Sequence, residues 1–194
     1  MAVYNSTTKK MNFYNGSSWQ SFTSTASFPA PSTPLFTAAT TSGYTASAST
    51  ENAGTLFAWY AFNQNIGTPG WASAASCYNA SGVAIAGSLG GITGSWVKIQ
   101  FDVFRTVSSM NFTVNISTEE PKRWYVLYSA DDITWNTAYS TYSATDFTSY
   151  SPGTGVSSTG VLSFASPVIC KYIAIVITKN GNAGNTALRE IYYA

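Results

Sequence analysis

The sequence contains no histidine, and charged residues make up only 9% of its 194 residues. The missing histidine removes the commonest general base and a common metal ligand, and the eight carboxylates are scattered along the chain. Ser, Thr and Tyr hydroxyls are abundant, but no adjacent base that could activate one as a nucleophile is visible. We therefore expect no catalysis. The formal net charge of +1 also gives nothing that would attract nucleic acid.

One pair of carboxylates leaves an enzymatic alternative. Glu119 and Glu120 are adjacent, just before Pro121. Such a pair could serve a glycosidase only if it were partly buried beside the scissile bond. A solvated corner is the simpler interpretation.

Long apolar runs and cysteines are equally scarce. No run approaches the roughly 18 apolar residues of a membrane span, so we expect no membrane insertion. The first ten residues are polar and lack the apolar core of a signal peptide. Cys77 and Cys170 are too few and too far apart for a zinc site or a disulfide framework. Two buried thiols are expected, with a single bridge as the alternative.

The length suits one well-buried domain with a small appendage. Residues 3–22 alternate apolar and polar side chains around two turn signals, of which Asn15-Gly16 is the stronger. This predicts a small β-meander, and so small a ribbon cannot bury its own aromatic rings. We therefore assign residues 1–24 to an N-terminal β-ribbon. The proline-rich residues 25–37 are expected to be an extended linker, and residues 38–194 the main domain.

The main domain contains many short stretches with the period of two that is typical of strands. Residues 123–128 alternate in this way, and Asp131 and Asp132 favour a turn into a return strand at residues 133–135. The alternative for these two carboxylates is a metal or sugar contact. Further strands are expected at residues 96–103, 110–116, 161–164, 169–178 and 187–193.

One segment has no defensible period. Residues 77–94 are rich in Gly, Ala and Ser and are expected to be a long loop that could line a site. Tyr44 is expected to be a half-exposed residue at a sheet edge. Many short strands with turn signals and long end loops predict an all-β antiparallel sandwich.

The order of motifs resembles the discoidin family, the coagulation-factor 5/8 type C domains, which are close relatives of the family-32 carbohydrate-binding modules. The resemblance rests on five segments in the family's order, at residues 60–71, 95–101, 124–135, 171–177 and 187–193. It implies a galactose-binding-like jelly-roll fold and a non-catalytic, lectin-like module that binds carbohydrate. Residues 1–24 resemble a short repeat of viral tail-fibre and spike proteins.

These resemblances imply a phage-like fibre, spike or capsid-associated protein that attaches to glycans on a host cell surface. The alternative is a structural virion or surface protein that has kept the jelly roll and lost the sugar site. The partners expected are a host glycan and, through residues 1–24, other virion proteins. We also expect a homo-oligomer, a trimer as in many fibre proteins, located on the virion surface after synthesis in the host cytoplasm.

The resemblance also implies a structural calcium site, which the departures from the family pattern leave open. In sugar-binding relatives calcium often braces the loop that corresponds to residues 63–68, with a carboxylate matching Glu190. The candidate ligands here are Asn63, Asn65, Thr68 and Glu190. Asn63 replaces the usual Asp, and calcium prefers several oxygen ligands that include carboxylates. We therefore expect hydrogen bonds rather than an ion to hold this loop, and no other cofactor.

A ligand of a jelly roll meets the loops at one end of the sandwich, because the strands are committed to the core. The matching loops are residues 71–78, 104–107, 119–123, 142–150 and 180–185. Arg105 is the first candidate sugar contact, since relatives often place an Arg in this region. The alternative is an ion pair between Arg105 and Asp102. The other candidates are Tyr78, Glu119, Tyr150 and Asn182.

Overall fold

The computed structural model describes residues 2–5, 10–14, 19–21, 35–52, 54–65, 70–114, 118–141, 146–148, 150–152, 157–181 and 184–194, with the backbone alone for 2–21 and 151–152. Its elements are β1 Ala2–Asn5, β2 Lys10–Tyr14, β3 Trp19–Ser21, β4 Thr40–Thr41, β5 Tyr44–Ala48, the 3-10 helix η1 Ala58–Phe62, β6 Trp71–Ala72, β7 Ser88–Leu89, β8 Ile92–Thr93, β9 Ser95–Val114, β10 Pro121–Ser129, β11 Asn136–Ser140, β12 Ser151–Pro152, β13 Ser157–Ser158, β14 Leu162–Asn180, β15 Ala187–Leu188 and β16 Glu190–Tyr193. The described part of the chain contains no helix long and apolar enough to cross a membrane.

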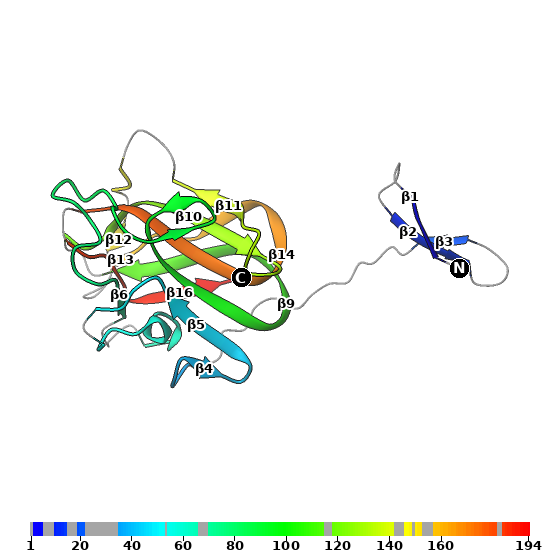
Figure 1. The fold of residues 1–194 in the computed structure, drawn as a ribbon, viewed down its shortest axis with the longest axis horizontal. Coiled ribbons are helices and arrows are strands. Elements are labelled where there is room, and N and C mark those ends of the chain that lie inside the picture. Colours follow the sequence, from blue (N-terminus) through cyan, green and yellow to red (C-terminus); the bar gives the residue numbers. More distant parts are fainter. Residues whose placement is uncertain are drawn as a thin grey trace.

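Two long strands, β9 and β14, join the two layers of the main domain (Figure 1). The first part of β9 pairs with β5 on one side and with the second part of β14 on the other, and β10 and β11 extend this layer. The last part of β9 pairs with the first part of β14, with β13 and with β16 to form the other layer. All these pairs are antiparallel, so the expected antiparallel jelly-roll sandwich is confirmed. The ribbon β1–β3 is an antiparallel meander that pairs only within itself in the described structure.

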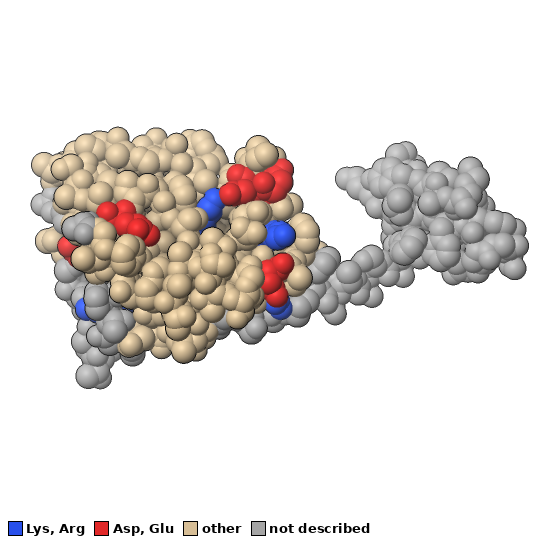
Figure 2. Space-filling view, turned by 60° about the horizontal axis from the view of Figure 1, so that its bottom comes forward, with Lys and Arg blue, Asp and Glu red and all other residues tan. Residues whose placement is uncertain are grey.

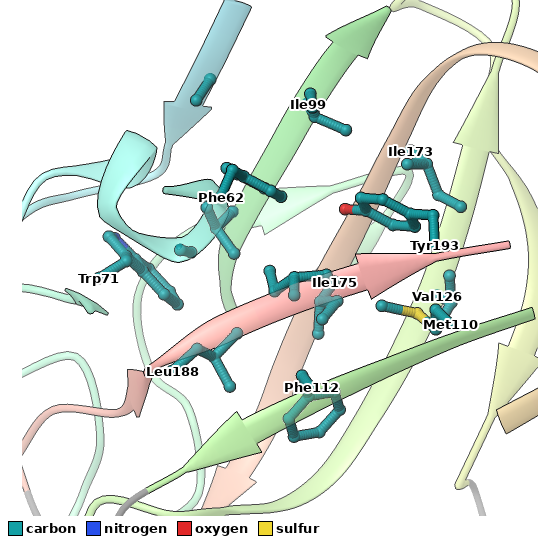
Figure 3. Packing of buried hydrophobic residues seen from close by; sticks show 14 of the residues in the cluster. Phe62, Trp71, Ile99, Met110, Phe112, Val126, Ile173, Ile175, Leu188 and Tyr193 are labelled. Atoms are coloured by element: carbon teal, nitrogen blue, oxygen red, sulfur yellow. The ribbon is translucent and has the colours of Figure 1, made fainter. Parts of the chain in front are cut away.

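The core lies between the two layers. Figure 3 shows Met110 and Tyr193 of one layer pointing toward Val126 and Ile173 of the other. The rings of Phe101 and Tyr193 meet edge to face with centroids 6.0 Å apart. Each large apolar side chain buried in this way contributes about 1.5–3 kcal/mol. Cys77 and Cys170 are both buried and free, as expected, so the fold holds without a disulfide; burial raises the pKa of the Cys170 thiol to about 12.

The predicted alternation is correct within each half of β9 but fails at its centre. Residues 97, 99 and 101 are buried, and so are residues 110, 112 and 114. Val103, however, is 50% exposed, although continued alternation would place it on the buried face with residues 97, 99 and 101. The register between β9 and β14 shifts between Cys170 and Tyr172 as β9 passes from one layer to the other. Two strands predicted as separate are therefore one bent strand, and the same holds for the two that form β14.

Three further expectations are corrected. Tyr44 is 4% exposed rather than half-exposed, because its ring packs against Phe36 and Phe101. Phe36 is also buried, although it lies in the segment expected to be linker, so the packed core already includes that residue. The return strand after β10 is β11, which begins at Asn136 instead of at residue 133. Residues 130–135 form the connecting turn instead.

The segment 77–94, expected to be a long loop, covers the outer face of the layer that contains β10. The hairpin β7–β8 packs there so closely that a Cβ atom added to Gly90 would lie 2.8 Å from Cβ of Trp135 and 3.1 Å from Cδ1 of Leu127. Gly90 also has a φ of +58°, which favours glycine. This cover explains why Leu127 and Val176 are buried although they point away from the core.

Candidate functional site

Three loops are joined by hydrogen bonds at one end of the sandwich. The carbonyl oxygen of Gly184 accepts hydrogen bonds from the amides of Cys77 and Tyr78. The carbonyl oxygen of Glu119 accepts a bond from the amide of Ala187 and another, at 2.8 Å, from the hydroxyl of Thr186. Described parts of the predicted loops 71–78, 119–123 and 180–185 are therefore joined at this end of the sandwich, together with Thr186 and Ala187.

Glu119 and Asn185 provide the polar centre of this surface. The side-chain amide of Asn185 donates to Oε1 of Glu119 at 3.1 Å, and both residues are partly exposed. Asn185 is held in turn through its carbonyl oxygen, which accepts a hydrogen bond of 2.6 Å from the side chain of the buried Asn180. A carboxylate acceptor beside an amide donor matches what neighbouring sugar hydroxyls require. We call this pair the loop-end site.

A cluster of charges from neighbouring segments was not predicted from the sequence. Arg123 Nε and Lys179 Nζ donate to the two carboxylate oxygens of Asp146, at 2.8 and 2.6 Å. These hydrogen bonds hold the pKa of Asp146 below its ordinary value, and the bond from Lys179 has the largest effect. The strand register brings Arg123 and Lys179 face to face across β10 and β14, and the segment after β11 supplies Asp146.

The adjacent carboxylates that left an enzymatic alternative are both engaged. Glu120 forms an ion pair with Lys122, and Glu119 accepts the hydrogen bond from Asn185. Figure 2 shows one face of the molecule, on which the few charged side chains are surrounded by broad neutral areas. Several of the acidic and basic groups on this face lie next to each other. The geometry gives each of the two carboxylates a separate partner.

Tyr78 and Tyr150 belong to the framework of this end. The hydroxyl of Tyr78 donates to the carbonyl oxygen of Ile177 at 3.0 Å, and the residue is only 4% exposed. The hydroxyl of Tyr150 donates to the carbonyl oxygen of Pro121, and its ring meets Phe147 edge to face. Burial raises the pKa of both phenols well above the ordinary value, so both hydroxyls stay protonated. Asn182 lies outside the described residues.

Arg105 is not part of the loop end. The segment 104–107, predicted to be a loop, lies within β9. Arg105 is ten residues after Ser95, the first residue of that strand. Its Nη2 atom donates to Oδ1 of Asp102 at 2.7 Å and to the hydroxyl of Tyr44 at 2.8 Å. The side chain is 11% exposed, so it is largely committed to these partners. The geometry matches the alternative of an ion pair with Asp102, and Arg105 keeps the pKa of Asp102 low.

Three of the four candidate metal ligands, Asn63, Asn65 and Glu190, lie close together. The Glu190 side chain is fully buried, and its Oε2 atom accepts a hydrogen bond from the backbone amide of Asn65 at 3.3 Å. The same amide donates to Oδ1 of Asn63 at 2.9 Å. The other carboxylate oxygen of Glu190, Oε1, is buried without a hydrogen-bond partner. Thr68 lies outside the described residues.

The described residues do not fit a calcium ion. Calcium takes six to eight oxygens and favours several carboxylates, whereas Glu190 is the only carboxylate among the four candidate ligands. No three His, Cys, Asp or Glu side chains gather anywhere in the described ranges. Burial raises the pKa of Glu190 to about 7, against the effect of backbone hydrogen bonds from Gln64 and Asn65. Near neutral pH a proton can therefore neutralise the buried carboxylate of Glu190.

Comparison with known protein families identifies the family of this chain. The F5/8 type C domain model matches residues 39–191. The chain belongs to this family. The expected resemblance is thereby confirmed over most of the chain, and the match begins close to the predicted boundary of the main domain. No protein among the curated sequences matches the chain.

Solved structures of carbohydrate-binding modules share the fold of this F5/8 type C domain. A family 32 module of NanJ from C. perfringens, in complex with galactose, is 18% identical, with a TM-score of 0.54 over 78% of this chain and 93% of that one. A chitosan-binding module from Paenibacillus sp. IK-5 is 20% identical, with a TM-score of 0.54 over 78% and 95%. The module of AlyQ in complex with 4,5-unsaturated mannuronic acid is 15% identical, with a TM-score of 0.52 over 77% and 92%. At such identities these likenesses establish the fold.

Proposed function

We propose that this F5/8 type C domain is a non-catalytic carbohydrate-binding module and that glycans are its ligands. The observation that carries the proposal is the loop-end site, where Glu119 and Asn185 combine an acceptor and a donor on a partly exposed surface of a carbohydrate-binding-module fold. Structural neighbours are described as complexes with galactose, with GalNAc-β-1,3-galactose and with an unsaturated mannuronic acid. The absence of histidine from the sequence argues in the same direction, away from catalysis.

A glycan array followed by calorimetry tests this function. The full chain should bind a defined set of glycans, and Glu119→Gln and Asn185→Ala should each weaken binding about tenfold, since each removes one side of the polar pair. Glu51→Gln is a matched control, because the Oε1 atom of Glu51 accepts a hydrogen bond from the amide of Ala58 and the glutamine oxygen can still accept it. Binding that is unchanged in both loop-end variants would place the sugar elsewhere.

We further propose that the module attaches a viral particle to glycans on a host surface. The proposal is supported by the resemblance of residues 1–24 to tail-fibre and spike repeats, and by the separate meander β1–β3. In this role the ribbon contacts another virion protein or a second copy of the chain, and the chain is a homo-oligomer such as a trimer on the virion surface. Light scattering of the full chain and of a chain lacking residues 1–24 gives the test. This role would be contradicted if both chains were monomeric and the ribbon bound no virion protein.

A further inference from the structure

Lys98 lies among three aromatic rings on the outer face of the sheet, away from the loop-end site. Its Nζ atom is 5.3 Å from the ring centroid of Trp96 and 5.8 Å from those of Trp135 and Tyr172. These distances are within the reach of cation–π attraction. Trp96 and Lys98 come from β9, Tyr172 from β14 and Trp135 from the turn after β10. Only the tertiary structure therefore brings these three rings together around Lys98.

Asp132 completes the arrangement by pairing with Lys98. Both carboxylate oxygens of Asp132 accept from Lys98 Nζ, at 2.5 and 2.6 Å. Asp132 has a φ of +64°, and the turn is held by Oδ1 of Asp131, which accepts hydrogen bonds from the amides of Ile133 and Thr134. The pair is therefore fixed in place. We call Trp96, Lys98, Asp132, Trp135 and Tyr172 the sheet-face cluster.

The two indole rings of the cluster are also fixed in orientation. Nε1 of Trp96 donates to the carbonyl oxygen of Ser88 at 3.0 Å, and Nε1 of Trp135 donates to that of Asp132 at 3.3 Å. Both rings are half-buried, and Gly90 packs beside the Cβ and Cγ atoms of Trp135. Rings that are held in advance lose little entropy when a ligand stacks on them.

The surface continues across the sheet with partly exposed polar side chains. Gln100 lies two residues after Lys98 on the same face of β9 and is paired with Tyr172 of β14 and with Thr45 of β5. Ser47 pairs with Lys98 in the same way. Gln100 of β9 with Thr45 and Ser47 of β5 forms a row of polar residues. This row offers hydroxyl and amide groups beside the rings.

We propose that the sheet-face cluster binds an extended neutral saccharide as a second ligand surface of this chain. A pyranose presents an apolar face that can stack on an aromatic ring, while its hydroxyls both donate and accept hydrogen bonds. Lys98 supplies donors and Asp132 supplies acceptors within one ion pair, so a vicinal diol can bond to both. The row through Gln100 then receives the next sugar unit along the sheet.

The charge balance selects a neutral ligand. The charges of Lys98 and Asp132 cancel each other, so the cluster has no net charge that would attract an acidic sugar. A free cation is also disfavoured, because Lys98 already places a positive charge beside the three rings. Stacking and paired hydrogen bonds of this kind are the contacts that a neutral oligosaccharide can make.

NMR of the full chain provides the test, with neutral galactotetraose, cellotetraose and N-acetylated chitotetraose as probes and tetragalacturonate as the acidic comparison. The six tryptophans give separate indole signals, which Trp→Phe variants assign. We expect millimolar additions of at least one neutral probe to shift the indole signals of Trp96 and Trp135, and tetragalacturonate to shift them less. Mapping on the unmodified chain does not depend on any variant that fails to fold.

Variants then separate this surface from the loop-end site. Lys98→Met and Tyr172→Ala should each weaken binding of the active neutral probe about tenfold, with the indole signals of the buried Trp71 and Trp124 unchanged as a check of folding. Lys171→Met, next to Tyr172 but outside the cluster, is the control. Binding that disappears in Glu119→Gln but persists in Lys98→Met would overturn the second surface and leave the proposed function standing. Loss of the Trp96 and Trp135 shifts in Lys98→Met, with the shifts kept in Glu119→Gln, would support the surface and leave the loop-end site to its own glycan test. No shift with any probe would overturn this inference.

Discussion

Nη2 of Arg105 donates a hydrogen bond of 2.8 Å to the hydroxyl of Tyr44, a residue 61 positions earlier in the chain. The same guanidinium group binds Asp102, and its carbon lies 5.8 Å from the centroid of the Tyr44 ring. Arg105 therefore ties the bend of β9 to β5. This arrangement assigns the residue to the framework of the sandwich, at the part of β9 where the chain passes from one layer to the other.

Arg105→Ala is expected to lower the free energy of unfolding by about 1–3 kcal/mol, because the charged hydrogen bonds of a largely buried side chain are lost. Glycan binding by the folded variant should be unchanged. Urea unfolding measures the first effect and calorimetry the second. A double-mutant cycle with Tyr44→Phe should show a coupling of about 0.5 kcal/mol or more between the two side chains. Loss of glycan binding without loss of stability would restore Arg105 as a sugar contact.

The pKa of Glu190 predicts how stability depends on pH. Because its pKa rises from 4.5 to about 7 in the folded protein, the folded state holds a proton that the unfolded state has released between these values. Stability should therefore be highest at the acidic side of this window and fall as the pH rises through about 7. Thermal unfolding of the Glu190→Gln variant should lack this part of the pH dependence. Equal slopes for the two proteins between about pH 5 and pH 8 would contradict the assignment.

Calcium should have little effect on the same loop. Hydrogen bonds from the amide of Asn65 to Asn63 and Glu190 hold the loop, and Glu190 is the only carboxylate among the candidate ligands. We expect chelation to shift the melting temperature by less than about 1 °C, and magnesium at equal ionic strength to act like calcium. A rise of several degrees that is specific to millimolar calcium and absent in Glu190→Gln would show a true site.

Removal of the N-terminal ribbon should leave the main domain intact. A chain that starts at Leu35 keeps Phe36, whose ring contacts Phe62 with a centroid distance of 5.8 Å. A chain that starts at Thr37 loses this ring and should be less stable by about 3 kcal/mol, the usual scale for a deleted core phenylalanine. Denaturant unfolding of the two truncated chains and of the full chain measures the difference. If the chain from Leu35 unfolds or aggregates, the ribbon belongs to the core.

Two neighbouring glycines allow a matched test of how the hairpin β7–β8 packs. Gly90 and Gly91 both have positive φ, at +58° and +77°, but only Gly90 lies against Trp135, since nothing lies within 4 Å of a Cβ added to Gly91. Both Gly→Ala changes pay the backbone cost of positive φ, about 1 kcal/mol. Gly90→Ala should cost about 1 kcal/mol more and should shift the indole signal of Trp135. Equal losses in the two variants would mean that the hairpin does not press on the ring.

The sequence by itself determined the local features of this protein. Alternation placed residues 97, 99 and 101 in the core because the period of two is a property of the strand alone. Asp131 was correctly assigned to turn chemistry, since its carboxylate bonds to backbone amides two and three residues later. The order of five short motifs was enough for the family, which the match over residues 39–191 confirmed.

Tertiary structure alone decided which distant side chains meet. The bend in β9, and with it the exposure of Val103 and the partners of Arg105, depends on a register shift against β14 that leaves no local pattern. The pair Glu119 and Asn185 is 66 positions apart, and the rings around Lys98 come from three segments. Hydrophobic periodicity fixes the face on which a side chain lies, whereas the neighbour of that side chain is fixed by strand order and register, which arise only when the whole sandwich packs.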